Sequence, residues 1–349
     1  MAQTLRFHFI TFNYLLFRHV VAWHSGKIGA SVMPDRMIVC ISANPALDRQ
    51  LRLPVLTSGE VNRAVRAVAL PGGKAAHVAL SAQALGAQVL WIGFAGGPIG
   101  EECAAELARL KVETIAVRTK FSSRVNLEII EDSGRITEVL EPGRAPEATE
   151  QAEMLRTLGD ALRSQWKGAV VAISGSLPEG LDPAFYVSLI ELTHNAGSKV
   201  FVDTSGEPLR ASTRAKPEFV KPNRRELEYL LGKSLADIDA ARKGAKQLLE
   251  EGARSASVTL GPDGIVWAEE SGGPVWLARP PRLKPLSTVG CGDATLAGFA
   301  CAAVNGWRGE KALRFATACG AANCLAEFEG RISASDVQSL IPQIQIQTI

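Results

Sequence analysis

The chain has 349 residues, of which 46% are hydrophobic, enough to bury the core of a single α/β domain of roughly 300 residues. Its 38 basic and 36 acidic residues nearly cancel, so the net charge of +2 argues against nucleic acid or an acidic membrane surface as a partner. The six cysteines are scattered without the spacing of metal ligands, which is typical of a protein of the reduced cytoplasm.

The first residues of the chain differ in character from the remainder. Between Leu5 and Trp23 the sequence is rich in apolar and aromatic residues, but arginine and histidine residues interrupt it. A transmembrane helix needs about 20 apolar residues with few charges, and a signal peptide ends at a small-residue cleavage site that this segment lacks. We interpret residues 1–35 as an extension outside the fold, and we prefer a start assigned upstream of Met33 or Met37 to a membrane anchor.

From Met37 onward, apolar runs with β propensity alternate with helical patterns. This alternation predicts one α/β domain, residues 36–349, with a doubly wound sheet. The runs are continuously apolar, as in a mostly parallel sheet that helices cover on both faces. The predicted strands are Ile38–Ile41, Val89–Gly93, Ala169–Ser174, Val200–Asp203, Phe219–Lys221 and Ser257–Leu260. The predicted helices lie near Ala75–Leu85, Gly100–Leu110, Glu147–Ser164, Pro183–Asn195, Arg225–Leu231 and Ala240–Glu251.

One region departs from this rhythm. Residues Arg124–Ile130 alternate apolar and polar side chains, and after a turn-like segment Ile136–Leu140 resumes the strand pattern. The alternation predicts a hairpin with one face in solvent. Together with Leu51–Leu53 and Val65–Ala69, this hairpin is expected to form a small sheet that closes over a pocket as a lid. The lid segments are predicted at about 48–70 and 112–142.

The segment Asn44–Asp48 follows the first predicted strand at its carboxyl end, where ligands bind in open α/β sheets. A carboxylate at this place can accept hydrogen bonds from sugar hydroxyl groups, which makes Asp48 a candidate substrate ligand. Asn-Pro is also an ordinary turn opener, and in that interpretation Asp48 is a solvated loop charge.

A glycine pair precedes the first predicted helix. Gly72 and Gly73 permit close approach of the backbone to a ligand, and Lys74 offers a positive charge for a phosphate. The segment is not a Walker A loop, because the spacer before Gly-Lys-Ser/Thr is missing. His77 follows on the helix, and it either binds a sugar hydroxyl group or is a helix-face histidine satisfied by its neighbours.

Three other polar or glycine-rich segments lie at strand ends or in the hairpin. Gly93–Gly100 lacks the spacing and the acidic partner of a dinucleotide fingerprint, so we discount it. Arg124, together with Asn126, is either a surface charge or a guanidinium clamp for the phosphate of a phosphosugar. In Ser174–Pro178 no nucleophile motif is present, so Ser176 is a substrate contact or part of a strand-end turn.

Two later strands also end in turns. In Lys221–Leu227, Asn223 and Glu226 lie on one helical face, where a carboxylate and waters can hold a hydrated Mg²⁺. The same two residues fit a plain capping box. The segment Thr259–Gly264 is a glycine turn of a good hairpin, which needs no ligand.

The segment Ser287–Asp293 precedes a run of small residues, Ala294–Val304, that is expected to be helical. Gly290 and Gly292 allow a sharp turn that aims N–H groups outward, where the helix dipole reinforces them, and this predicts an anion site. A carboxylate beside that site is useful if it takes a proton from a group that attacks the anion. The alternative is that Asp293 simply caps the helix.

The string Ser-Thr-Val-Gly-x-Gly-Asp at 287–293 resembles the C-terminal signature of the PfkB sugar kinases, the ribokinase-like family. In that family the aspartate is the base that activates the acceptor hydroxyl group, and the preceding amides form the anion hole. The resemblance implies these roles for Asp293 and for Gly290, Cys291 and Gly292. Cys291 stands where the family usually has alanine, but only its N–H is required.

Other segments resemble family motifs in the expected order, from Ile38 to about Ile341: Asn-Pro-Ala-x-Asp, Arg-x-Asn, Ser-Gly-Ser-Leu-Pro and Asn-x-x-Glu. The residues implied to bind substrate are Asp48, Gly72, Gly73, Lys74, His77, Arg124, Asn126 and Ser176. Those implied to bind the nucleotide are Lys221, Asn223, Thr259, Gly261, Gly264, Ser287 and Val289, and the metal is assigned to Glu226 and Asn223. Small residues at Ala318–Ala322 are expected to leave room for the adenine.

The chain departs twice from the family pattern Gly-Gly-Lys-Gly-x-Asn-x-Ala, with Ala75 for the last glycine and His77 for the asparagine. An asparagine amide donates and accepts in fixed directions, whereas a neutral imidazole offers one of each. His77 therefore either keeps the role of a hydroxyl ligand or signals a changed substrate.

The resemblance implies a ribokinase-like enzyme with a β-sheet lid that uses ATP and Mg²⁺ to phosphorylate a ketohexose phosphate. The first expectation is fructose 1-phosphate as the acceptor, with tagatose 6-phosphate or fructose 6-phosphate as alternatives within the family. A kinase for an unphosphorylated sugar or nucleoside, and a non-catalytic sugar-phosphate sensor, are further alternatives. Retention of Asp293 and Glu226 speaks against a sensor, because binding alone needs neither base nor metal. Exposed edges of the lid strands predict a homodimer.

Overall fold

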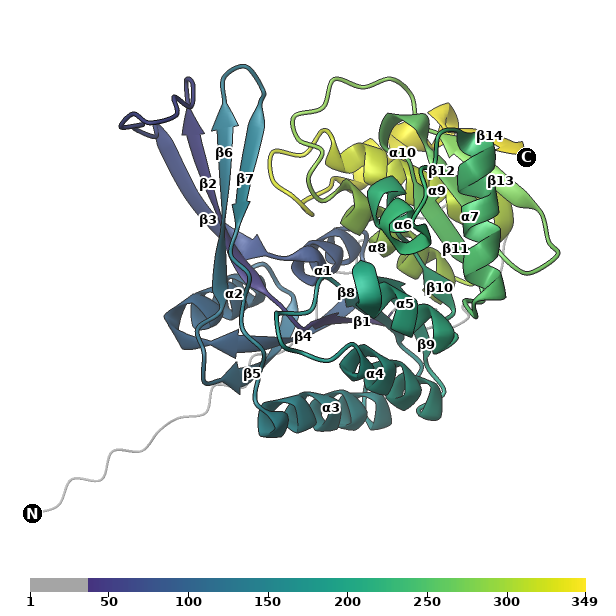
Figure 1. Ribbon diagram of the computed structural model, residues 1–349, viewed down its shortest axis with the longest axis horizontal. Helices are drawn as coiled ribbons and strands as arrows, with labels where there is room; N and C mark the ends of the chain where they lie inside the picture. Colours follow the sequence, from purple (N-terminus) through teal and green to yellow (C-terminus); the bar gives the residue numbers. More distant parts are fainter. Residues whose placement is uncertain (1–36) are drawn as a thin grey trace, which may run out of the picture. The chain divides into compact units, whose positions relative to one another are not determined.

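A computed structural model describes residues 37–349, so the predicted N-terminal extension lies outside the described residues. The larger of two sheets has the strand order β14-β13-β12-β11-β10-β9-β8-β1-β4-β5 (Figure 1). Every neighbouring pair from β5 through β11 is parallel, and β11 to β14 pair antiparallel. The bounds are β1 Met37–Ser42, β4 Gln88–Gly96, β5 Glu113–Thr119, β8 Val170–Ser174, β9 Lys199–Asp203, β10 Phe219–Val220, β11 Ala256–Thr259, β12 Ile265–Ala268, β13 Val275–Arg279 and β14 Gln345–Thr348.

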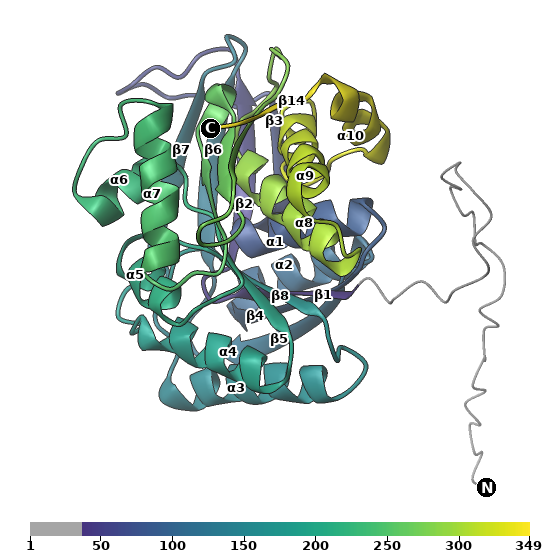
Figure 2. The ribbon, with the colours of Figure 1, turned by 90° about the vertical axis from the view of Figure 1, so that its right-hand side faces the viewer.

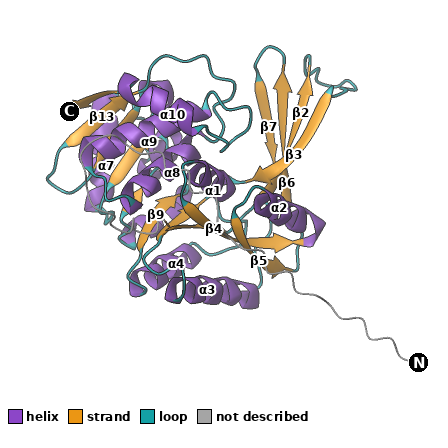
Figure 3. Ribbon diagram, turned by 180° about the vertical axis from the view of Figure 1, so that it is seen from behind, coloured by secondary structure: helices purple, strands orange, loops and turns teal. Residues whose placement is uncertain are grey.

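Helices cover both faces of this sheet, as the apolar strand runs predict (Figures 2 and 3). Ile38 and Cys40 of β1 belong to a core shared with α1, α8 and α9, whereas Val39 and Ile41 belong to a second core shared with α3, α4 and α7. The mostly parallel α/β fold is confirmed. The helices are α1 Lys74–Ala84, α2 Gly97–Arg109, α3 Ala148–Arg163, α4 Ala184–Asn195, α5 Gly206–Arg214, α6 Arg224–Leu231, α7 Ile238–Glu250, α8 Cys291–Val304, α9 Gly309–Asn323 and α10 Ala334–Leu340, with 3₁₀ turns at Gly261–Asp263 and Ile341–Gln343.

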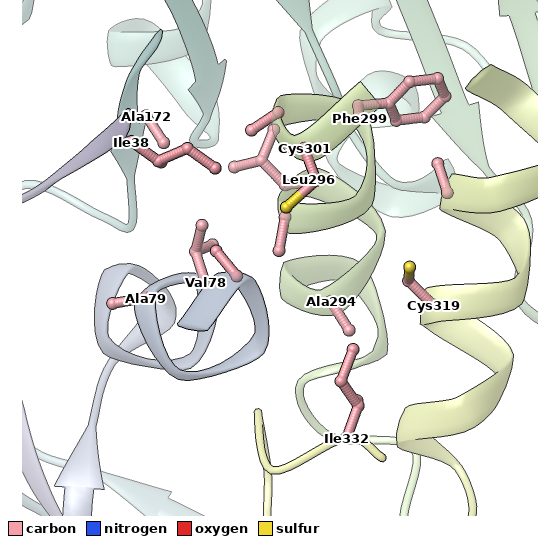
Figure 4. Close-up of a cluster of buried hydrophobic side chains, with 14 of the residues drawn as sticks. Ile38, Val78, Ala79, Ala172, Ala294, Leu296, Phe299, Cys301, Cys319 and Ile332 are labelled. Atoms are coloured by element: carbon pink, nitrogen blue, oxygen red, sulfur yellow. The ribbon is translucent and has the colours of Figure 1, made fainter. Parts of the chain in front are cut away.

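Helix α8 is buried around most of its circumference, which is why its sequence is a run of small and apolar residues. Leu296 and Cys301 on α8 lie in the core that α1 and α9 share (Figure 4). Val78 of α1 faces this core, and Cys319 enters it from α9. Because this core encloses α8, the helix is rigid and its first turn is held in a fixed position.

The smaller sheet has the order β3-β2-β6-β7 and stands away from the larger one (Figure 1). Strand β2 pairs parallel with β6 and antiparallel with β3, and β6 and β7 form the predicted hairpin. The bounds are β2 Ala46–Leu53, β3 Arg66–Gly72, β6 Arg124–Glu131 and β7 Ile136–Leu140.

One boundary of the predicted lid is wrong. The sequence predicts that the lid includes the segment from about 112, but Glu113–Thr119 forms β5 at the edge of the large sheet. As an edge strand, β5 is half exposed and lacks the continuous apolar run of the central strands, so its sequence resembles that of a lid strand. Between residues 37 and 349, no helix has both the length and the apolarity that crossing a bilayer requires.

Candidate active site

A cavity of about 1100 Å³ lies at the carboxyl ends of the parallel strands, between the first turn of α8 and the small sheet. Almost all predicted site residues line it, although they come from separate turns of the chain. The lining includes Asp48, Gly73, Lys74, His77, Arg124, Asn126, Ser176, Lys221, Asn223, Glu226, Thr259, Gly261, Gly264, Val289, Gly290, Cys291, Gly292 and Asp293.

Two predicted ligand contacts, Gly72 and Ser287, do not line the cavity. Gly72 pairs with Ala46 in the small sheet, and a Cβ atom at Gly72 would lie 2.0 Å from Oδ1 of Asp48. Gly72 therefore makes room for the carboxylate behind the cavity wall. The hydroxyl of Ser287 accepts a hydrogen bond from the N–H of Val289 at 3.1 Å, so it shapes the turn before α8.

The turn into α8 leaves its first amides without side-chain partners. Gly290 is the N-cap residue, with a left-handed φ of 77° that favours glycine, and no side chain caps the helix. The first N–H groups of any helix have no acceptor within it, so those of α8 can bind an anion. The hypothesis that Asp293 is the cap is wrong, because Asp293 lies inside the first turn. Asn323 holds the turn by donating from Nδ2 to the carbonyl oxygen of Val289 at 2.7 Å.

Asp293 is linked to the small sheet through His77. Nδ1 of His77 lies 3.0 Å from Oδ2 of Asp293, and Nε2 lies 3.2 Å from Oδ2 of Asp48. Asn126 donates from Nδ2 to Oδ1 of Asp48 at 2.7 Å. Burial lowers the pKa of His77, but the hydrogen bonds to Asp293 and Asp48 and their negative charges raise it more, to well above the ordinary 6.5. The helix-face histidine is thus satisfied by neighbours that belong to the cavity.

Two lysines converge on a buried carboxylate beneath the start of α8. Nζ of Lys221 lies 2.9 Å from Asp203, and Nζ of Lys74 lies 3.1 Å from Asp203 and 2.9 Å from Glu226. The sequence predicts that the positive charge of Lys74 binds a phosphate. In the structure this charge lies between the carboxylates of Asp203 and Glu226. A Cβ atom at Gly292 would lie 3.2 Å from Nζ of Lys221, so this buried cation adds positive charge beside the amide turn.

Asn223 and Glu226 form the complete capping box of α6. Oδ1 of Asn223 accepts from the N–H of Glu226 at 2.9 Å, and Oε2 of Glu226 accepts from the N–H of Asn223 at 2.8 Å. The carboxylate still lines the cavity. A single carboxylate suits a hydrated Mg²⁺ whose other ligands are waters and phosphate oxygens. Within residues 37–349, no cluster of three or more His, Cys, Asp or Glu side chains could hold a metal ion by itself.

Arg124 lies at the edge of the cavity with much of its guanidinium group already bonded. Nη1 donates to Oδ1 of Asn126 at 3.0 Å and to the carbonyl oxygen of Glu141 at 2.9 Å. Nε and Nη2 each lie 3.3 Å from the carbonyl oxygen of Asn44. These bonds hold the guanidinium group beside Asn126, which in turn donates a hydrogen bond to Asp48.

Several lining residues were missed in the sequence. Glu128 and Glu138 face the cavity from β6 and β7, and Asp203 lies at the end of β9. Glu128 follows Arg124 and Asn126 at the two-residue period of a strand, so the alternation of β6 places its side chain on the same face of the sheet. Burial, then the charges of Glu329 and Asp48, raises the pKa of Glu128 to about 7. Asp203 had no such signal, since it ends a strand as many aspartates do.

Two thiols meet at the end of the cavity where α8 begins. Sγ of Cys291, in the first turn of α8, lies 3.3 Å from Sγ of Cys324, which follows α9. Gly320 and Ala321 of the predicted adenine wall also line the cavity here. The hydrogen bond from Cys291 lowers the pKa of Cys324 to about 7 despite partial burial, and the same contact raises the pKa of Cys291.

Cys324 is therefore expected to be the first of the six cysteines to react with iodoacetamide at pH 7. Its alkylation rate should rise with pH with a midpoint near 7 instead of the usual value of about 8.5. Peptide mass spectrometry after timed labelling identifies the site, and a Cys324→Ser variant provides the control. Faster labelling of the buried Cys40 or Cys103 would contradict the assignment.

The comparisons with known proteins agree with this geometry. The family model for pfkB family carbohydrate kinases matches residues 35–329. The 1-phosphofructokinase of Vibrio cholerae is 29% identical over 315 residues, which are 90% of this chain and 98% of that protein. The 1-phosphofructokinase of Haemophilus influenzae is 31% identical over 88% of this chain and 96% of that protein. The crystal structure of phosphofructokinase-2 from Escherichia coli in complex with fructose-6-phosphate superposes with a TM-score of 0.78 and 30% identity, covering 88% of this chain and 97% of that chain. The chain belongs to the pfkB family of carbohydrate kinases.

Proposed function

We propose that this protein transfers the γ-phosphoryl group of ATP to fructose 1-phosphate, giving fructose 1,6-bisphosphate. The observation that carries the proposal is the position of Asp293, in the first turn of α8 and across one cavity from the small sheet. Relatives named 1-phosphofructokinase over nearly the whole chain support the choice of acceptor. Fructose 6-phosphate is the second candidate, because phosphofructokinase-2 binds it and shares the fold.

In the proposed mechanism the amide turn at Gly290–Gly292 holds the transferred phosphoryl group. Asp293 accepts the proton of the acceptor hydroxyl group as that oxygen attacks in line. Asp48 and Asn126 hold the sugar, and Arg124 faces its phosphate. Lys221 contributes positive charge behind the turn without contacting bulk solvent, since its side chain is 2% exposed.

The nucleotide is proposed to lie along Thr259–Gly264 and Val289, with its base near Gly320 and Ala321. Glu226 would hold Mg²⁺ through one carboxylate oxygen and water, with Asn223 fixing the carboxylate. When bound, the ion neutralises charge on the phosphate oxygens. The reduced cytoplasm is the proposed compartment, because Cys291 and Cys324 are reduced thiols although their sulfur atoms lie only 3.3 Å apart.

An ADP-release assay tests the proposal with fructose 1-phosphate, fructose 6-phosphate, tagatose 6-phosphate and free fructose as acceptors. We expect the highest kcat/KM for fructose 1-phosphate. A preference for fructose 6-phosphate selects the second candidate, and a preference for free fructose contradicts both. Binding of these sugars without turnover would identify a sensor.

Replacement of Arg124 by methionine is expected to raise KM for the phosphorylated acceptor by about 10- to 100-fold, as for a lost hydrogen bond to a charged group. The kcat/KM for free fructose should change little. Arg118→Met is the matched control, because this arginine is 88% exposed on β5. An equal loss for both acceptors would show that Arg124 supports the lid and does not bind the phosphate.

We also propose that the small sheet forms a homodimer interface. Among residues 37–349 no strand pairs with the outer edges of β3 and β7, and Val139 and Leu140 on β7 are 53% and 57% exposed. Sedimentation analysis of the protein and of a Val139→Lys variant tests this proposal. A monomeric parent protein would exclude it.

A further inference from the structure

His77 occupies the position where the family pattern has asparagine, and it does more than face a substrate. Its two ring nitrogens contact carboxylates on different elements, Asp293 on α8 and Asp48 on β2. The His77 side chain is 7% exposed, and the backbone of Gly330 packs closely against the backbone of His77. The ring therefore has little freedom to leave either contact.

With both carboxylates ionised, the two contacts together require a doubly protonated ring. An ionised carboxylate accepts hydrogen bonds and donates none, so each nitrogen needs its own proton. A neutral ring would turn a lone pair toward a carboxylate oxygen at 3.0 or 3.2 Å. The raised pKa of His77 agrees with this requirement.

The surroundings of the ring are acidic. Besides Asp48 and Asp293, the acidic groups that interact with it are Glu128 of β6, Glu138 of β7 and Glu329 after α9, and Lys74 of its own helix lies near Asp293. Gln50 bridges Glu128 and Glu329 at 2.9 and 2.6 Å. On α2, burial raises the pKa of Cys103 to about 12, so that thiol adds no charge. An imidazolium at position 77 is the cation at the centre of this cluster.

We propose that His77 is a positioning residue that ties the general base Asp293 to the sugar-binding carboxylate of Asp48 through one imidazolium. This inference rests on the proposed function. His77 holds Oδ2 of Asp293, which leaves Oδ1 to receive the proton of the acceptor. Binding of the sugar at Asp48 and proton transfer at Asp293 are thereby coupled, and an asparagine, which reaches only one of them, lacks this coupling.

The link has a defined pH dependence. Because the pKa of His77 in the folded protein is above its ordinary value, the link is complete below about 6.5 and is lost as pH rises through the raised pKa. We expect kcat/KM to fall on the alkaline side for this reason. Glu128, with its pKa of about 7, produces a separate change, and in the His77 variants this change should move to higher pH because the charge of His77 lowers the pKa of Glu128.

Two variants separate the two halves of the link. In His77→Asn the amide nitrogen takes the place of Nδ1, so the contact to Asp293 persists and the contact to Asp48 is lost. We expect KM for the sugar to rise about tenfold with kcat little changed, as for one lost hydrogen bond to a charge. His77→Gln reaches the place of Nε2, so kcat should fall about 10- to 100-fold with a smaller change in KM.

Neither variant should show the alkaline fall that His77 causes, because amides do not titrate. His194→Asn is the matched control, since His194 also pairs with a carboxylate, Glu218 at 3.2 Å, but does not line the cavity. Unchanged alkaline profiles in both variants, or equal losses in KM and kcat that track thermal stability, would overturn the proposal.

Ring protonation is measured independently of any substrate. In ¹⁵N-labelled protein, long-range ¹H–¹⁵N spectra distinguish singly from doubly protonated imidazole, and the signals of His77 are those missing from either variant. We expect two protonated ring nitrogens at pH 7.5, and a neutral ring would overturn the proposal. Should no sugar phosphate be turned over, the proposed function fails, while this measurement still decides whether the imidazolium bridge exists.

Discussion

Replacement of Asp293 by asparagine is expected to lower kcat by about 10²- to 10⁴-fold, the usual contribution of a general base. Asparagine has nearly the same shape and keeps an oxygen for the N–H of His77, so the fold and the cavity should persist. Its amide cannot take a proton from the acceptor hydroxyl group. KM values for ATP and for the sugar should change much less than kcat, because the amide turn at Gly290–Gly292 remains.

Steady-state kinetics with fructose 1-phosphate, or with whichever acceptor proves best, measures this change. Asp160→Asn is the matched control, because Asp160 lies on the outer surface of α3 in exposed ion pairs with Arg156 and Arg163. Near-parental turnover in Asp293→Asn would remove Asp293 as the base. A loss seen only in KM would assign Asp293 to binding.

Replacement of Asp203 by asparagine is expected to reduce the free energy of unfolding by about 3–5 kcal/mol, as when one partner of a buried ion pair is removed. Lys221 is fully enclosed and lies 2.9 Å from Asp203, so its charge would lose its closest compensation. Lys74 is about a third exposed and retains Glu226. Urea denaturation followed by circular dichroism measures the change.

Acid titration supplies a second test of the same pair. Burial raises the pKa of Asp203, but Lys221 and Lys74 lower it more, so the net shift is below the ordinary 3.8. The pair therefore contributes its full stability above this value and loses it as pH falls through the lowered pKa. The parent protein should lose stability in that acidic range more steeply than Asp203→Asn.

Asp239→Asn is the matched control for both measurements, because Asp239 pairs with Arg242 and Lys243 on the exposed side of α7. Exposed ion pairs contribute little to folding, so no comparable loss is expected. Equal stabilities of the Asp203→Asn and Asp239→Asn variants would show that Lys221 finds another partner.

The sequence alone was sufficient for the α/β class and for most of the cavity lining. Apolar strand runs, such as Ile38–Ile41, are local patterns that burial on both faces imposes, so they can be recognised without coordinates. The turn at Gly290–Asp293 is likewise local, because its geometry depends on glycine and on the start of the following helix. The predicted ligands at Asp48, Arg124 and Asn126 followed from the resemblance of their segments to family motifs, because their positions at a strand end and on a hairpin also fit surface charges.

Only the tertiary structure decided which of these groups are bonded to one another. His77 and Asp293 are 216 positions apart, and their 3.0 Å contact depends on how α1 packs against α8. Lys221 meets Asp203 because β9 and β10 are neighbours, and β5 belongs to the large sheet because β4 accepts it as a partner. Strand order and helix packing are set by the whole core. The sequence therefore determined the chemical groups of the site, whereas their pairing, and with it the protonation of His77, was decided by long-range packing that no local pattern records.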